Sequence, residues 1–129
     1  MESIPMPICE LCDRLTIVAL KLERLPDSEI DKEELKKQYD YYTKGVDFNN
    51  PQICAALSEL KMHNAHIWDL EYEIRKGLDE QLGYEEIGKR AVKIRDVNRL
   101  RVNLKNRISE IAGQSEFKDC KMNHVSENQ

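Results

Sequence analysis

Two stretches of almost thirty residues without an internal proline constrain the fold more than any other feature of the chain. The first follows Asn50 and Pro51, which suit the N-cap and the first position of a helix, and it extends to about Asp79. The second extends from Gly83 to about residue 113. A helix of about 28 residues is roughly 42 Å long at 1.5 Å per residue. Two such helices joined by a short turn are expected to pack as an antiparallel pair.

Two further helices are predicted before this pair. Apolar residues recur at steps of three and four from Ile8 to Leu25, and Pro26 ends the pattern. A shorter helix then extends to about Lys44, with Gly45 as a suitable C-cap. The chain is therefore predicted to be all-α, an antiparallel helical bundle of three long helices plus one shorter helix.

Length and charge narrow the class of protein. The 129 residues predict a single domain over 1–129, with a core of about 8–113 and a polar C-terminal tail at 114–129. The net charge of −4 argues against general nucleic-acid binding, which usually requires a basic surface. The chain has no run of 18 apolar residues and no signal-peptide core at its start, which predicts no membrane partner and a cytoplasmic location.

Polar residues interrupt the apolar seams of both long helices. Asn64 and Glu71 fall on the seam of the first long helix. Arg101 falls on the seam of the second, with Asn98 and Lys105 one turn to either side. A buried polar group without a partner costs about 1–3 kcal/mol, so these residues are expected to meet one another or a ligand. The two interruptions lie near the middle of each helix, where an antiparallel pair brings them to the same level.

The bases around these interruptions outnumber the acids, which predicts an anion site. Arg75 lies one turn beyond Glu71, and Trp68 lies between the two interruptions of its helix. Guanidinium groups bind phosphate and carboxylate with paired hydrogen bonds. The predicted ligand-binding residues are Lys21, Arg24, Asn64, Trp68, Glu71, Arg75, Asn98, Arg101 and Lys105.

The third wall of this site is expected from the charged face of the first helix, which carries Lys21 and Arg24. On its own this face is typical of a solvated surface, and Asp13 and Glu23 are assigned to the same solvated surface. A structural polar network that only fixes helix register is the alternative to a ligand site.

Cysteine and histidine spacing does not predict a cofactor. Cys9 and Cys12 form a single CxxC within a helical pattern, which favours small buried thiols over a zinc or redox site. His63 and His66 are three residues apart, but neither has a glutamate three residues before it, as helical di-iron sites require. No metal site and no cofactor are therefore predicted.

Three segments resemble motifs of an uncharacterised, mostly bacterial, all-helical family associated with lipopolysaccharide and other surface-glycan gene neighbourhoods. Residues 10–24 (ELCDRLTIVALKLER) resemble ELxDKxTILxIKxER. Residues 64–75 (NAHIWDLEYEIR) resemble NxxLWxIEDxIR, and residues 98–109 (NRLRVNLKNRIS) resemble NDxRAxIKxxIN. The resemblance implies a helical fold and marks the same polar residues, but it implies no established activity.

This chain departs from the family pattern at four positions. Arg14 stands in place of Lys, Tyr72 and Arg99 each stand in place of Asp, and Ser109 stands in place of Asn. The loss of two acids would make the site more positive and could change its ligand.

Three functions are compatible with this sequence. The first is binding of an anionic small molecule, such as a nucleotide or nucleotide-sugar, without an established reaction. The second is an enzyme with the same pocket, similar to chorismate mutases or to helical nucleotide pyrophosphatases. The pyrophosphatase pattern E-E-x-x-E is absent, because Glu33-Glu34 and Glu85-Glu86 stand without its third acid. The third is a structural module, such as a homodimer. No catalytic residue is predicted.

Overall fold

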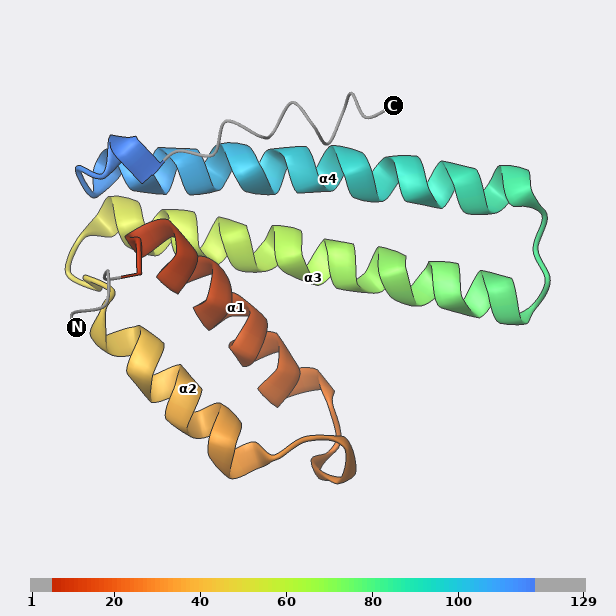
Figure 1. Ribbon diagram of the computed structural model, residues 1–129, viewed down its shortest axis with the longest axis horizontal. Helices are drawn as coiled ribbons and strands as arrows, with labels where there is room; N and C mark the ends of the chain where they lie inside the picture. Colours follow the sequence, from red (N-terminus) through yellow and green to blue (C-terminus); the bar gives the residue numbers. More distant parts are fainter. Residues whose placement is uncertain (1–5, 118–129) are drawn as a thin grey trace, which may run out of the picture.

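The computed structural model describes residues 6–117 and contains four α-helices (Figure 1). No strand occurs within this described part of the chain, so the predicted all-α class is confirmed. Two short 3-10 helices, η1 and η2, accompany the four α-helices. The elements are α1 (Ile8–Arg24), η1 (Asp27–Glu29), α2 (Lys32–Lys44), α3 (Pro51–Asp79), α4 (Tyr84–Ile111) and η2 (Ser115–Phe117).

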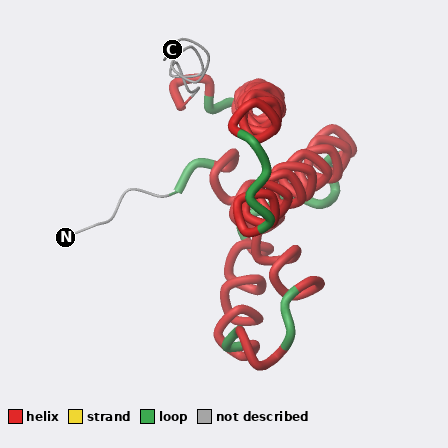
Figure 2. The backbone as a smooth tube through the Cα atoms, turned by 90° about the vertical axis from the view of Figure 1, so that its right-hand side faces the viewer, coloured by secondary structure: helices red, strands yellow, loops and turns green. Residues whose placement is uncertain are grey.

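The helices form two antiparallel hairpins of different length (Figure 1). α3 and α4 have 29 and 28 residues, whereas α1 and α2 have 17 and 13. The sequence predicted three long helices, but α1 is closer in length to α2 because Pro26 ends its pattern early. α1 contacts each of the other three helices. Viewed along the α3–α4 pair, the α1–α2 hairpin extends away from α4 (Figure 2).

Local capping chemistry explains where α2 and α3 begin and where α2 ends. Asn50 is the N-cap of α3, and its Oδ1 accepts hydrogen bonds from the backbone N–H groups of Gln52 (2.9 Å) and Ile53 (3.4 Å). Asp31 caps α2 by accepting a hydrogen bond from the N–H of Glu34. Gly45 is the C-cap residue of α2. The predicted roles of Asn50 and Gly45 are confirmed.

The apolar core lies at one end of the long hairpin, where α1 packs against α3 and α4. Of residues 65–96, all of which the structure describes, only Gly77 is buried. A Cβ at Gly77 would lie 2.9 Å from Ile87 Cδ1, so the two long helices approach closely there. The core residues are Cys9, Leu11, Cys12, Leu15, Val46, Ile53, Ala56, Leu60, Leu104 and Ile108.

The start of the predicted C-terminal tail contacts the first helix. The side-chain Oε1 of Gln114 accepts a hydrogen bond of 2.8 Å from the backbone N–H of Ile8 at the N-terminus of α1. This bond satisfies one of the N–H groups that a helix start leaves without an intrahelical partner. Residue 114 is thus part of the packed structure, while residues 118–129 of the predicted tail lie outside the described residues. None of the described helices is long and apolar enough to span a membrane.

Candidate functional site

The polar residues that interrupt the seams of α3 and α4 meet around a buried carboxylate on α1. Asp13 is only 3% exposed, although the sequence placed it on a solvated face. Arg101 of α4 binds both carboxylate oxygens, with its Nε 3.0 Å from Oδ1 and its Nη2 bonded to Oδ2. Asn64 of α3 donates a third hydrogen bond to Oδ1 at 3.0 Å. One carboxylate therefore connects α1, α3 and α4.

Thr16 completes this network one turn along α1. Its hydroxyl donates a hydrogen bond to the backbone carbonyl of Asp13 and accepts one from Asn64 Nδ2, each at 2.8 Å. Both N–H groups of the Asn64 amide are thereby occupied. Asn64 and Thr16 are buried at 7% and 2% exposure, so their hydrogen bonds offset the cost of removing polar groups from water.

The partners of Asp13 keep it ionised despite burial. Burial alone would raise the pKa of this carboxyl group, but the hydrogen bond and charge of Arg101, with help from Asn64 and Lys105, lower the pKa below its ordinary value. The hydrogen bonds that Arg101 donates to Asp13 in turn raise the pKa of Arg101, against the opposing effect of burial. The pair is thus a charged ion pair at neutral pH.

A second ion pair lies beside the first. Lys105 Nζ donates a hydrogen bond of 2.7 Å to Glu10 Oε2 and lies 3.9 Å from Asp13 Oδ2. The Lys105 side chain is 12% exposed. α1 therefore supplies two acids, Glu10 and Asp13, to the two bases of α4.

A pocket of about 330 Å³ adjoins this network between α1, α3 and α4. Its polar lining comes from the two interrupted seams, and its apolar lining includes residues of all three helices. The residues that line it are Ile17, Leu20, Asn64, Ile67, Trp68, Glu71, Ile94, Asn98 and Arg101.

Five of the nine predicted ligand-binding residues meet in this pocket: Asn64, Trp68, Glu71, Asn98 and Arg101. Antiparallel pairing of α3 and α4 brings them to one level, as the sequence predicted. Arg101 Nη1 also donates a hydrogen bond of 3.0 Å to Asn98 Oδ1.

The other four predicted residues do not line this pocket. Lys21 lines a different hollow, between α1 and the η1–α2 segment. Arg24 pairs with Asp69 at 2.7 Å, and its guanidinium carbon lies 5.8 Å from the centre of the Trp68 ring. Arg75 is exposed on α3, and Lys105 is bound to Glu10. The third wall expected from Lys21 and Arg24 is instead formed by Ile17 and Leu20 of α1.

The predicted excess of positive charge is largely neutralised. Asp13 compensates Arg101, and Glu10 compensates Lys105. The ionisable residues in the pocket lining are Arg101 and Glu71, which carry opposite charges. The sequence argument overestimated the positive charge because it counted Glu71 as the principal acid and assigned Asp13 to solvent.

A pattern in the sequence could have indicated that Asp13 is buried. Cys9, Cys12, Thr16 and Leu20 are spaced by three and four residues, so small or apolar residues form a second stripe on α1. All four are buried, and Asp13 lies beside this stripe. α1 has two buried faces because it packs against three helices.

Burial disfavours ionisation of the Cys12 thiol on α1. Cys9 and Cys12 are both buried, as predicted for small core thiols. Burial, the neighbouring Cys9 and the charge of Asp13 raise the pKa of Cys12 to about 12. Cys54 is less buried and donates a hydrogen bond from its sulfur to the Phe48 carbonyl at 3.1 Å.

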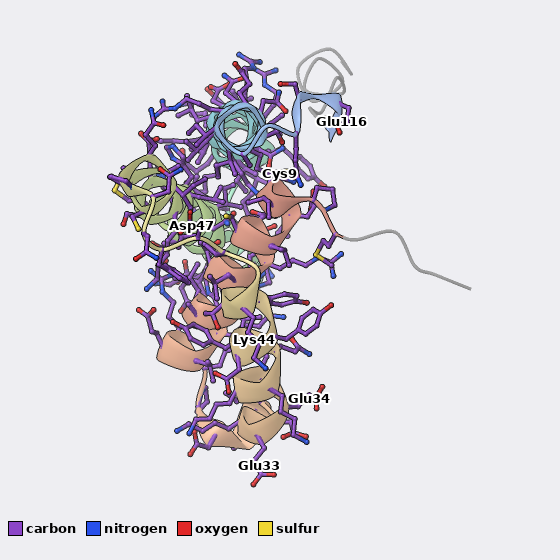
Figure 3. The ribbon with its side chains drawn as sticks, turned by 90° about the vertical axis from the view of Figure 1, so that its left-hand side faces the viewer. Cys9, Glu33, Glu34, Lys44, Asp47 and Glu116 are labelled. Atoms are coloured by element: carbon purple, nitrogen blue, oxygen red, sulfur yellow. The ribbon has the colours of Figure 1, made fainter. Side chains whose placement is uncertain are left out.

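Acidic, histidine and cysteine side chains do not converge on a metal-binding arrangement within residues 6–117. Glu33 and Glu34 lie at the free end of the α1–α2 hairpin, far from Cys9 and the long helices (Figure 3). The exposed pair Glu85 and Glu86 lies in the first turn of α4. Neither glutamate pair is among the residues that line the pocket.

Comparison of the chain with protein-family models, curated proteins and solved structures finds no match. The family resemblance of the three motifs therefore stays a prediction. The candidate site is defined by the geometry of its own residues.

Proposed function

We propose that the pocket beside the Asp13 network binds an anionic small molecule, with Arg101 as its anchor. The observation that carries this proposal is that the Arg101 guanidinium has N–H donors that the protein does not use. This group has five N–H donors, and three of them are used by Asp13 and Asn98. Two N–H donors remain on a rigidly held cation that lines the pocket. A pre-oriented guanidinium loses little conformational freedom when it binds phosphate or carboxylate.

The rest of the lining supports a ligand larger than a simple ion. A volume of about 330 Å³ is at the lower end of the range of small-molecule sites, roughly 300–1,000 Å³. Trp68 offers a ring surface, and Ile67 and Ile94 offer apolar contact. A nucleotide or a nucleotide-sugar fragment combines an anionic group with a ring in this way.

Tryptophan fluorescence tests the proposal, because Trp68 is the only tryptophan of the chain and lines the pocket. Titration with nucleoside monophosphates and diphosphates is expected to give a saturable change in emission and a higher melting temperature. If none of these anions changes either signal at millimolar concentration, the proposal is wrong.

Arg101→Lys gives the matched variant. Lysine keeps the charge that Asp13 requires but loses the planar fork, so ligand affinity is expected to fall about tenfold or more. Arg107→Lys, an exposed position on the same helix, is the control and should bind as the wild type does.

A structural role for the network is the second candidate. The observation that favours it is the complete pairing of Asp13, whose carboxylate has partners on both α3 and α4. If the network only fixes helix register, Asn98→Ala should leave folding intact and no ligand should discriminate it from the wild type. An enzyme with the same pocket, a homodimer and a cytoplasmic location stay predictions from the sequence.

A further inference from the structure

The pocket wall offers both hydrogen-bond donors and acceptors that the protein does not use. Within residues 6–117, the Glu71 carboxylate makes no ion pair within 4 Å, and the Asn98 NH₂ group makes no hydrogen bond. Asn64 has used both its N–H groups, so its carbonyl oxygen is what it can offer. Glu71 is close enough for its charge to act on Arg101. Acceptors on Asn64 and Glu71 and donors on Asn98 and Arg101 therefore line the same pocket.

A phosphate group alone does not match this wall. Phosphate oxygens accept hydrogen bonds but, when fully ionised, do not donate them, so they can pair with Arg101 and Asn98 but not with Glu71. The negative charge of Glu71 also opposes an anion placed next to it. A hydroxyl group both donates and accepts, and adjacent hydroxyls can bridge a carboxylate and an amide.

The apolar part of the lining suits one face of a saturated ring. Trp68, Ile67 and Ile94 line the same pocket as Glu71 and Asn98. Arg24 lies over the Trp68 ring, so it helps to hold the indole in place. Rigid aromatic side chains provide a large contact area at a low cost in conformational entropy.

We infer that the ligand of this pocket carries a polyhydroxylated ring, that is, a sugar or ribose, together with its anionic group. The ring packs against Trp68, its hydroxyls bind Glu71 and Asn98, and the anion binds Arg101. This inference rests on the proposed function and specifies its ligand as a sugar phosphate.

Two matched phosphates test the inference in isothermal titration calorimetry and Trp68 fluorescence. Glucose 1-phosphate and cyclohexyl phosphate carry the same anion on a six-membered ring, but only the first has hydroxyls. The sugar phosphate is expected to bind about tenfold more tightly or better, because only its hydroxyls can replace the water that the exposed Glu71 and the half-buried Asn98 lose when the ring covers them. Ribose 5-phosphate is a second sugar phosphate for the same comparison.

Variants assign the preference to the two proposed residues. Glu71→Gln and Asn98→Ala are each expected to reduce the ratio of the two affinities severalfold, because each variant loses a group that binds the sugar hydroxyls. Glu59→Gln and Asn103→Ala, exposed positions on the same two helices, are the controls and should keep the full ratio.

The outcomes separate this inference from the proposed function. Equal binding of the two phosphates overturns the sugar inference and leaves the anion site standing. Binding of methyl glucoside as tightly as glucose 1-phosphate overturns the role of the anion and supports the sugar. If neither phosphate binds, both the proposed function and the inference are wrong.

Discussion

At the scale of single residues, Asp13 determines the site. Its carboxylate is 5% exposed and holds Arg101, whose side chain is 25% exposed. Removing one member of a buried ion pair typically costs about 3–5 kcal/mol because the other charge stays buried. We expect Asp13→Asn to lower the free energy of unfolding by about 3 kcal/mol, measured by urea denaturation at pH 7. A loss below about 1 kcal/mol would show that water solvates this pair more than its burial indicates.

The same residue predicts a pH dependence. The pKa of Asp13 is lower in the folded chain than its ordinary value of 3.8, so folding favours the ionised form. This contribution to stability is complete above the unfolded pKa and is lost as the pH falls through the lower, folded pKa. In urea denaturation between pH 7 and pH 2, the wild type should therefore lose more stability than Asp13→Asn below about pH 4. If the stability of the two proteins fell in parallel with pH, ionised Asp13 would not be the source of this pH dependence.

A third prediction at this scale concerns thiol reactivity. With a pKa of about 12, Cys12 has almost no thiolate at pH 8, and its side chain is also shielded from reagents. In mass spectrometry after treatment with iodoacetamide, we expect Cys54 to be modified well before Cys12. Labelling in denaturant is the control, since unfolding should remove the difference. Equal labelling of the two cysteines in the native protein would disagree with the buried position of Cys12.

At the scale of helices, the capping of α3 can be tested by one substitution. Asn50 accepts hydrogen bonds from two backbone N–H groups at the start of the longest helix. Loss of an N-cap side chain typically costs about 1 kcal/mol. Asn50→Ala should therefore lower the urea midpoint by an amount that corresponds to about 1 kcal/mol, whereas Asn49→Ala, which is exposed and precedes the cap, should have little effect.

The ends of the helices were predictable because the residues that set them act locally. Pro26, Asn50 and Gly45 impose their effects through backbone geometry and short-range hydrogen bonds, whatever the rest of the chain does. It was also predictable that the polar interruptions of α3 and α4 lie at one level, since a tight turn fixes the register of an antiparallel hairpin.

The buried faces of α1 were not predictable in the same way. A single apolar stripe predicts one buried face, but α1 lies among three helices and buries two. The side on which Asp13 lies is therefore decided by tertiary packing rather than by local pattern. Because the sequence argument placed Asp13 in solvent, it also misjudged the charge of the site. Asp13 neutralises Arg101, which the sequence argument treated as free to bind an anion.

At the scale of the whole molecule, packing is uneven along the long hairpin. All buried residues of the core cluster lie at the end where α1 and α2 join α3 and α4. Beyond the pocket, the two long helices contact mainly each other, and only Gly77 is buried between residues 65 and 96. The candidate pocket thus lies at the boundary between the densely packed half and the sparsely packed half.

This boundary leads to a prediction about local stability. Regions with few buried apolar contacts open at a lower free energy than the core, and their amide hydrogens exchange faster with solvent. In hydrogen exchange followed by mass spectrometry, peptides from residues 70–92 should therefore exchange before peptides from residues 53–64 and 101–111. A bound sugar phosphate would contact α3 and α4 at the same level and oppose their separation, so it should slow exchange in residues 64–71 and 94–101 most strongly. If the ligand slowed exchange equally in α2, the protection would reflect a general stabilisation of the fold. It would then not support contacts of the ligand with residues 64–71 and 94–101.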